Sequence, residues 1–246
     1  MTGPKKRLDQ LLVDRRLADS RQRARSIIMA GSVRVDGELV DKPGRMIHPL
    51  ASVDLMVSEH PYVSRGGVKL EAALREFSIP LQGRTILDIG ASTGGFTDCL
   101  LQHGAKKVVA VDVGYGQLAW SLRNDQRVMV LERKNIRHLS TQEIHEDIEG
   151  AVIDTSFISL RIVVPAALKH LKKNSFLLAL IKPQFEVGKG MVGKGGIVRD
   201  AEQQKSVVAE LENFFTDLGL EVRGTMESPI TGAKGNREYF IYLTCP

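Results

Sequence analysis

From Thr85 to the end of the chain, short apolar runs alternate with longer amphipathic or polar segments. Runs of strand length occupy residues 85–89, 107–111, 128–131, 150–153 and 176–181. A long helix is expected over 201–218, and two further strands over 221–228 and 238–244. Strands that alternate with helices predict an α/β fold with a mostly parallel sheet and helices on both faces. Ligands of such sheets bind beyond the carboxyl ends of the strands.

A glycine-rich loop follows the first of these strands, in the run ILDIGASTGGFTDCLL. Glycine lets the backbone approach a ligand closely because it has no side chain. The spacing Gly-x-x-x-Gly-Gly differs from the dinucleotide fingerprint. Asp88 precedes the loop, and Asp112 ends the next strand, where an acidic residue holds ribose hydroxyls. These acids favour a cationic nucleoside without phosphates, such as S-adenosylmethionine, and the alternative is a tight turn without a ligand.

The first sixty residues show a different pattern. Leu8, Leu11, Leu12 and Leu17 predict an amphipathic helix, and a second helix is expected over 21–30. A hairpin over 33–40 and a strand over 52–57 follow. Residues 1–25 contain eight Lys and Arg against three Asp. This local excess of positive charge favours a polyanionic partner, nucleic acid before membrane, and a solvated basic face is the alternative.

The composition argues against several classes of protein. No stretch reaches the roughly 18 apolar residues of a membrane span, and no apolar core follows the basic N-terminus, as a secretory signal requires. The two cysteines, Cys99 and Cys245, are expected to be reduced thiols in a cytoplasmic protein. No His, Cys and carboxylate cluster has ligand spacing, so we expect no metal. A monomer is the expected state.

Two families resemble the two parts of the chain. The run RLDQLLVDRRLADSRQRARSIIMAGSVRVDGELV resembles the S4 RNA-binding domain, whose second helix faces RNA phosphates. The motifs VSRGGVKL, DIGASTGGFTD, VDVGYGQL, DTSFISL, IKPQFE and NREYF resemble the FtsJ-like RNA 2′-O-methyltransferases. The whole chain resembles the TlyA-like, or hemolysin A, family. This resemblance implies an S4 domain over 1–58, a linker over 59–63 and a Rossmann-like methyltransferase domain over 64–246.

The resemblance also implies a catalytic tetrad at Lys69, Asp154, Lys182 and Glu238. Lys182 is the expected general base, Asp154 and Glu238 position it, and Lys69 lies near the target ribose. An ordinary lysine is protonated at neutral pH, but burial and a second lysine nearby both favour the neutral amine. Asp154 and Lys182 end strands that are expected to be neighbours, so a common cleft follows from topology as well.

The remaining site residues rest on the same resemblance. The loop lines the methionine part of the cofactor, Asp112 holds the ribose and Asn135 lies near the adenine. The expected cofactor residues are Asp88, Gly90, Ala91, Ser92, Thr93, Gly94, Gly95, Phe96, Asp112 and Asn135. The expected RNA-binding residues are Lys5, Lys6, Arg7, Arg21, Arg23, Arg25 and Arg65. A glycine-rich loop with Lys189, Lys194 and Arg199 either closes over RNA or is a surface excursion.

These expectations combine into one function, S-adenosylmethionine-dependent 2′-O-methylation of ribosomal RNA, with cytidine as the implied nucleoside. One alternative is a non-catalytic RNA-binding or ribosome assembly factor, against which the intact tetrad argues. A second is a membrane-active hemolysin, against which the lack of any apolar span argues. A third is a methyltransferase for a small molecule, which the basic N-terminal unit disfavours.

Overall fold

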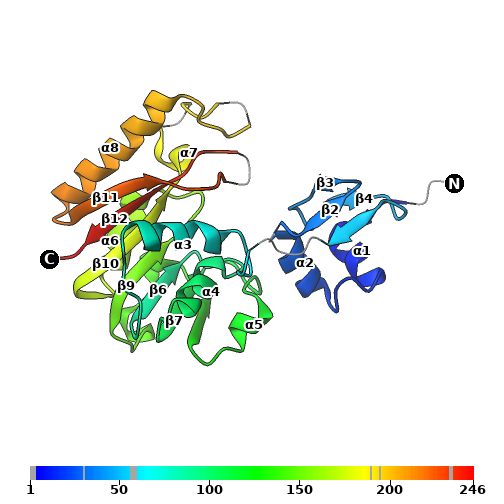
Figure 1. Cartoon of the computed structure of the whole chain (residues 1–246), viewed down its shortest axis with the longest axis horizontal. Helices are drawn as coiled ribbons and strands as arrows, with labels where there is room; N and C mark the ends of the chain where they lie inside the picture. The colour runs from blue at the N-terminus through cyan, green and yellow to red at the C-terminus, as the bar shows by residue number, and fades with distance from the viewer. Residues whose placement is uncertain (1–3, 30, 56–59, 189, 194, 233–234) are drawn as a thin grey trace.

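A computed structural model describes residues 4–29, 31–55, 60–188, 190–193, 195–232 and 235–246, and these form two lobes (Figure 1). The small N-terminal lobe contains two helices, α1 (Leu8–Asp14) and α2 (Arg21–Met29). One antiparallel sheet has the strand order β3 (Glu38–Leu39), β2 (Val33–Val35) and β5 (Val53–Leu55). Strand β1 (Lys6–Arg7) pairs with β4 (Met46–Ile47). The small α+β unit that the sequence predicts is therefore present.

The N-terminal lobe packs around one apolar cluster, to which Leu8, Leu12 and Ile28 contribute fully buried side chains. The first helix is shorter than predicted. It ends at Asp14, and Arg16 takes a left-handed φ of 59° that no helix can continue through. Ala30, the last residue expected in the second helix, and residues 56–57 of the expected last strand lie outside the described residues.

The large lobe is built on a seven-stranded sheet with the order β11-β12-β10-β9-β6-β7-β8. Its strands are β6 (Thr85–Ile89), β7 (Lys107–Asp112), β8 (Val128–Glu132), β9 (Ile148–Ile153), β10 (Leu171–Ile181), β11 (Glu221–Glu227) and β12 (Tyr239–Thr244). Strands β10, β9, β6, β7 and β8 are parallel, and β12 is antiparallel to both β10 and β11. The α/β class with a mostly parallel sheet is confirmed.

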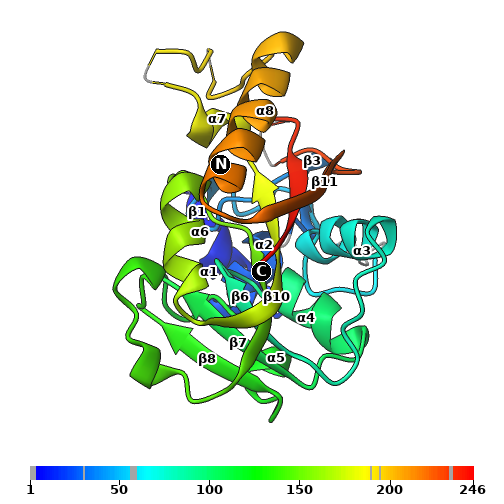
Figure 2. The ribbon, with the colours of Figure 1, turned by 90° about the vertical axis from the view of Figure 1, so that its left-hand side faces the viewer.

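Helices cover both faces of this sheet (Figure 2). The helices are α3 (Gly66–Glu76), α4 (Gly95–Gln102), α5 (Trp120–Arg123), α6 (Leu160–Leu168), α7 (Pro183–Glu186) and α8 (Ala201–Asp217), with 3₁₀ turns η1 (Ile136–His138) and η2 (Thr141–Glu143). Helices α6 and α8 pack in one apolar cluster, and α3 and α4 in another. The sheet is therefore the middle layer of three.

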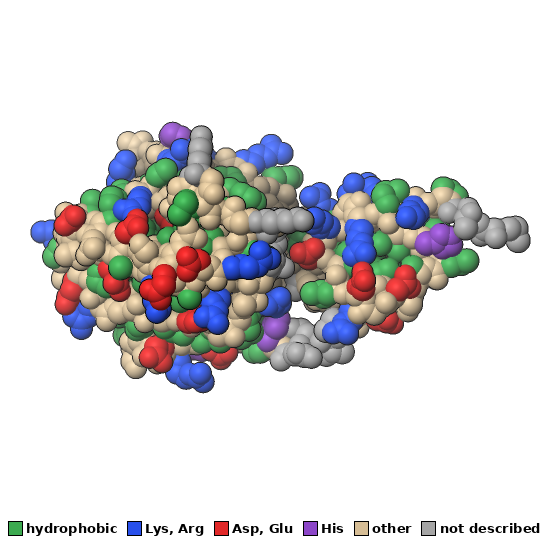
Figure 3. Space-filling view, turned by 90° about the horizontal axis from the view of Figure 1, so that it is seen from above, with side chains coloured by type: hydrophobic (Ala, Val, Ile, Leu, Met, Phe, Trp, Pro, Cys, Tyr) green, Lys and Arg blue, Asp and Glu red, His purple; other side chains and the backbone are tan. Residues whose placement is uncertain are grey.

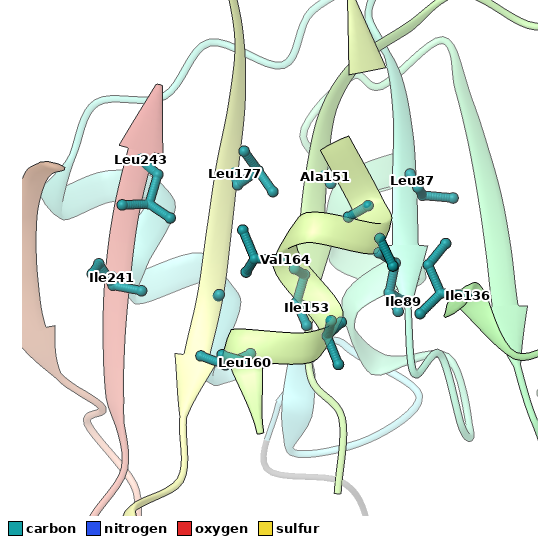
Figure 4. Packing of buried hydrophobic residues seen from close by; sticks show 14 of the residues in the cluster. Leu87, Ile89, Ile136, Ala151, Ile153, Leu160, Val164, Leu177, Ile241 and Leu243 are labelled. Carbon is teal, nitrogen blue, oxygen red and sulfur yellow. The ribbon is translucent and has the colours of Figure 1, made fainter. Parts of the chain in front are cut away.

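Strand residues alternate between these two clusters, as the period of two requires. Leu87 and Ile89 of β6 face α6, whereas Ile86 belongs to the cluster under α3 and α4. In Figure 4, Leu160 and Val164 of α6 lie against the sheet beside Ile153. This packing fixes the ends of β6, β9 and β10 with respect to one another, and the functional side chains follow those ends.

Several features of the large lobe were not predicted from the sequence, among them the short helices α5 and α7. Helix α6 was missed, because residues 160–168 are almost wholly apolar and contain Pro165. Strand β10 begins at Leu171, five residues before the expected start, and its register shifts between Leu171 and Phe176. The domain boundaries at 58 and 64 stay predictions.

Candidate active site

The glycine loop joins β6 to α4 and packs directly on the end of β9. Gly90 has a φ of 88°, and a Cβ atom there would lie 2.5 Å from the carbonyl oxygen of Asp154. Glycine is therefore required at this position for its conformation and for the close approach. Gly94, at the start of α4, has a φ of 97° and packs against Leu118 and Leu122 instead of a cavity.

A cavity of about 490 Å³, here called the strand-end cavity, opens beyond the ends of β6, β7 and β9. Its lining includes Gly90, Ser92, Asp112 and Asn135, all expected cofactor residues. Asp112 accepts hydrogen bonds from the backbone amides of Ser92 (2.8 Å) and Gly114 (2.7 Å). Asn135 Oδ1 accepts one from the amide of Arg137 at 3.1 Å and so caps η1. Both side chains are thus held by backbone at the edge of the cavity.

Asp88 lies below the loop and lines neither this cavity nor the next one described. It is fully buried and accepts a hydrogen bond of 2.6 Å from Thr97 Oγ1 in α4. Burial raises the pKa of this carboxyl to about 7. The structure therefore gives Asp88 a place in the support of the loop, and its direct contact with the cofactor stays a prediction.

The four tetrad residues form two ion pairs. Lys182 follows β10, Asp154 follows β9, and Lys182 Nζ lies 2.6 Å from Asp154 Oδ1. Lys69 of α3 pairs with Glu238 at 2.5 Å. Glu238 directly precedes β12, whose Tyr239 is opposite Ile181 at the end of β10. The antiparallel strand therefore brings Glu238 to the edge where the parallel strands end.

Burial distinguishes these pairs from ordinary surface ion pairs. Lys69 and Lys182 are each 9% exposed, and Glu238 is 3% exposed. Removing a charge from water is costly unless an opposite charge compensates it, so each buried ammonium group is stabilised by the carboxylate with which it pairs. Asp154 accepts no aligned hydrogen bond at Oδ1, and the Nζ of Lys182 instead donates one to Ser156 Oγ at 3.1 Å.

Lys69, Asp154 and Lys182 line a second cavity of about 270 Å³, here called the interlobe cavity. Its wall is shared with the loop, through residues that include Ala91, Thr93, Gly95 and Phe96. Four residues, Gly90, Ser92, Asp154 and Ser156, line both cavities. Asp154 and its ion-pair partner Lys182 therefore stand where the two cavities adjoin, and Lys69 lies on the wall of the interlobe cavity.

The N-terminal lobe forms the far wall of the interlobe cavity with Met29, Gly31, Leu39 and Asp41. Arg65, an expected RNA-binding residue, also lines it and donates a hydrogen bond to the carbonyl of Thr231 at 3.3 Å. Both lobes therefore shape the space in front of the tetrad.

The other expected RNA-binding residues are exposed, but several are ion-paired. Arg7 and Arg21 both pair with the buried Asp9, at 2.9 and 3.2 Å, and Arg7 lowers the pKa of that carboxyl. Lys6 pairs with Asp14 at 2.7 Å. Lys5, Arg23 and Arg25 are exposed, as is Arg199. Lys189 and Lys194 of the glycine-rich loop lie outside the described residues.

Sequence reasoning missed two residues beside the tetrad. Ser156 follows Asp154 by two positions in DTSFISL, and that spacing is the signal that could have found it. Phe157 is 90% exposed, has a φ of 64° and lies 4.9 Å from the ring of Phe185. An exposed phenylalanine in a left-handed conformation is unusual and marks a loop shaped for contact.

Glu186 joins the two loops that carry Asp154 and Lys182. Its carboxylate accepts hydrogen bonds from Ser159 Oγ (2.6 Å) and the amide of Leu160 (2.8 Å) at the start of α6. Burial raises the pKa of Glu186. The loop after β9 is therefore fixed to the loop after β10.

Within the described ranges, no group of three or more His, Cys, Asp or Glu side chains is arranged to hold a metal ion. None of the helices that these residues form is both long and apolar enough to cross a bilayer.

Known families match both lobes. Residues 62–245 match the family described as FtsJ-like methyltransferase, and residues 6–49 match the S4 domain. The chain is 48% identical over 238 residues to 16S/23S rRNA (cytidine-2′-O)-methyltransferase TlyA of Mycobacterium tuberculosis, covering 96% of this chain and 89% of the relative. It is 42% identical to Hemolysin A of Brachyspira hyodysenteriae, covering 96% of this chain and 99% of that protein.

Solved structures agree with these matches. A hemolysin candidate from Streptococcus thermophilus has a TM-score of 0.77 at 43% identity, covering 98% of this chain and 89% of that one. N-methyltransferase NodS from Bradyrhizobium japonicum, in complex with S-adenosyl-L-homocysteine, has a TM-score of 0.51 at 15% identity, covering 77% of this chain and 90% of that one. At that identity the likeness shows a shared fold.

Proposed function

Because the chain belongs to the family of FtsJ-like methyltransferases, we propose that it methylates a ribose 2′-hydroxyl of ribosomal RNA with S-adenosylmethionine. The name of the TlyA relative supports ribosomal RNA as the substrate and cytidine as the nucleoside. One observation carries the proposal, namely that the Asp154–Lys182 ion pair stands at the junction of the strand-end and interlobe cavities, with Lys69 and its partner Glu238 on the side of the interlobe cavity.

The strand-end cavity fits the cofactor. Its volume of about 490 Å³ lies in the range of small-molecule sites, roughly 300–1,000 Å³. Each oxygen of Asp112 accepts one backbone amide and keeps lone pairs for the two hydroxyls of a ribose. The loop at Gly90 offers bare backbone, and Asn135 stands at the adenine end in our assignment. S-adenosylmethionine, when bound, supplies an electrophilic methyl group on a sulfonium.

The surroundings of Lys182 fit a general base. Its Nζ donates a hydrogen bond to Ser156 Oγ at 3.1 Å and lies 2.6 Å from Asp154 Oδ1, without an aligned hydrogen bond to it. In the neutral amine, two directions carry hydrogens and the third carries the lone pair. We assign that third direction to the hydroxyl whose proton Lys182 removes. Asp154 and Ser156 then aim the base, and orientation of this kind contributes much of a rate enhancement.

Lys69 and Glu238 have a different part in this proposal. Lys69 lines the interlobe cavity from the side of α3, and Glu238 holds its ammonium group at 2.5 Å. An ammonium group donates up to three hydrogen bonds, so Lys69 has donors left for oxygens of the target ribose. We therefore assign Lys69 to substrate orientation, and the position of Glu238 behind Lys69 modifies the expectation that it positions Lys182.

The N-terminal lobe supports RNA as the substrate, because exposed arginines such as Arg23 and Arg25 provide phosphate contacts. We propose domain boundaries at 58 and 64 and a cytoplasmic location, where ribosomal RNA is found.

The test is methylation of ribosomes, separated subunits and free ribosomal RNA with labelled S-adenosylmethionine, followed by mapping of the product. The proposal predicts label on a ribose oxygen of one or a few cytidines. Label on a base, on protein or on none of these substrates would overturn it.

A second function is raised by the relative named Hemolysin A, and lysis of erythrocytes by purified protein without RNA or cofactor would establish it.

A further inference from the structure

We propose that Trp120 and Tyr115, together with arginines of α2, form a second RNA-binding surface that stacks an unpaired nucleotide near the target. This surface, here called the tryptophan surface, consists of Tyr115, Trp120 and Arg123 of the large lobe with Arg21, Gln22 and Arg25 of the N-terminal lobe. The inference rests on the proposed function, because it assumes that the polymer bound between the lobes is RNA.

The two aromatic side chains are unusually open to solvent. Trp120 and Tyr115 are each 67% exposed, and Trp120 is the only tryptophan of the chain. Single exposed apolar residues are common and need no explanation. Here, however, two large rings lie together in one hollow with arginines, which is how proteins present stacking surfaces for nucleobases.

Trp120 stands between two hollows. One, of about 510 Å³, is lined by the tryptophan surface. The other, of about 560 Å³, lies between Trp120 with Leu118 of the large lobe and Ser20 with Arg23 of the N-terminal lobe. The side chain of Gln22 donates a hydrogen bond to the carbonyl of Gly116 at 3.2 Å, which connects the lobes at this point. Trp120 therefore borders both hollows with a side chain that is open to solvent.

The charges beside these rings suit RNA. Arg123 pairs with Glu132 at 2.5 Å, and the guanidinium of Arg133 lies 4.3 Å from the centre of the Tyr115 ring. Arg23 and Arg25 are exposed and have no carboxylate partner among the residues that the structure describes. Phosphates would supply those partners, while bases would cover the rings.

Surface charge alone does not distinguish the tryptophan surface from the rest of the molecule. On the face seen in Figure 3, acidic and basic side chains are interspersed on both lobes. The tryptophan surface is distinguished by its exposed rings beside arginines, of which Arg25 has no carboxylate partner among the described residues. The rings favour an unpaired strand, because a base inside a duplex has no free face to stack.

Helix α2 connects this surface to the tetrad. Its first residue, Arg21, lines the tryptophan surface, and its last, Met29, lines the interlobe cavity with Lys69 and Lys182. Nine residues at a rise of about 1.5 Å span roughly 12 Å. Helix α2 therefore extends from the tryptophan surface to the interlobe cavity. Figure 1 shows α5 at the side of the large lobe that faces α2.

The single tryptophan provides a direct test. We expect a single-stranded RNA octanucleotide to quench the fluorescence of the intact protein in a saturable manner, and a duplex of the same length to quench at least five-fold more weakly. Sodium triphosphate should not quench. No quenching by the single strand, or equal quenching by the duplex or by triphosphate, would overturn the inference.

Variants make the test independent of fluorescence. With a labelled octanucleotide, Trp120→Leu should raise the Kd about ten-fold, as loss of base stacking does. Leu50→Ala changes another exposed apolar side chain, 82% exposed in the N-terminal lobe, and should bind like the wild type. Equal Kd values for Trp120→Leu, Leu50→Ala and the wild type would refute the surface.

Failure of this inference is distinguishable from failure of the proposed function. Normal methylation of ribosomal RNA without quenching would refute the tryptophan surface alone. Quenching with no methylation of any RNA would support the surface and refute the proposed function.

Discussion

Replacement of Ser156 by alanine tests how Lys182 is aimed. The Oγ atom of Ser156 accepts a hydrogen bond from Lys182 Nζ at 3.1 Å, while Asp154 Oδ1 remains at 2.6 Å. Ser156→Ala removes one of two oxygens that fix the amine and leaves the ion pair in place. Ser156 is exposed, so the change creates no buried cavity and the fold should be unaffected.

The size of the effect follows from that single hydrogen bond. A hydrogen bond to a charged group contributes about 1.5–3 kcal/mol and a neutral one about 0.5–1.5 kcal/mol, so we expect a loss of about 1–2 kcal/mol. Since about 1.36 kcal/mol corresponds to ten-fold in rate, kcat should fall about five- to thirty-fold. The Kd of S-adenosylmethionine should change less than about two-fold.

Single-turnover methyl transfer with saturating RNA measures kcat separately from cofactor binding, which calorimetry reports. Ser156→Thr keeps the hydroxyl and should restore most of the rate. Ser140→Ala removes a serine hydroxyl that caps η2, far from the cavities along the chain, and should leave kcat unchanged. A Ser156→Ala enzyme with wild-type kcat, or a Ser156→Thr enzyme as slow as Ser156→Ala, would refute the role of this serine.

Three further predictions address the loop, the sheet and the RNA. Gly90→Ala should abolish cofactor binding in calorimetry, because its Cβ would lie 2.5 Å from a backbone oxygen. The control Gly83→Ala has a φ of 76° and nothing within 4 Å of its Cβ, so it should lose only the stability that a left-handed alanine costs and should bind the cofactor normally. The pKa of Asp88 is about 7 in the folded protein and 3.8 ordinarily, so protonation favours the folded state, and the free energy of unfolding should fall as the pH rises from about 4 to 7. Urea titrations should show that Asp88→Asn lacks this fall. The same slope of unfolding free energy against pH in Asp88→Asn and the wild type would contradict the prediction. Neutralising Arg21, Arg23 and Arg25 to Gln should weaken RNA binding and lower the slope of log K against log salt by about two to three, and an unchanged slope would show that α2 does not bind phosphates.

Sequence reasoning located the tetrad best where the strand pattern was regular. Asp154 and Lys182 follow apolar runs that became the neighbouring parallel strands β9 and β10. Glu238 and Lys69 depended on family motifs, because an antiparallel strand beside β10 and a helix before β6 cannot be derived from a parallel alternation. The partners also differ from the expectation, since Glu238 contacts Lys69 and not Lys182.

Burial and loop geometry account for what the sequence did not reveal. In β6 the side chain of Asp88 points to the opposite face of the sheet from Leu87 and Ile89, toward Thr97 under the loop. The carboxyl is fully buried there, which the sequence did not predict. Ser156 lies in a loop and Trp120 begins the four-residue helix α5, which is too short to show periodicity, so no pattern predicted their contacts. The meeting of Trp120 with α2 depends on how the lobes pack, which a single sequence does not specify.

The central claim is that Lys182 removes the proton of a ribose hydroxyl on ribosomal RNA. Its most direct test compares wild type and Lys182→Ala for label transfer from S-adenosylmethionine to ribosomal RNA, with the modified position mapped and cofactor binding measured on the same samples. We expect a 2′-O-methylated ribose with the wild type, at least a hundred-fold slower transfer with Lys182→Ala, and nearly equal cofactor Kd values. Full activity of Lys182→Ala, or a methyl group mapped to a base, would contradict it.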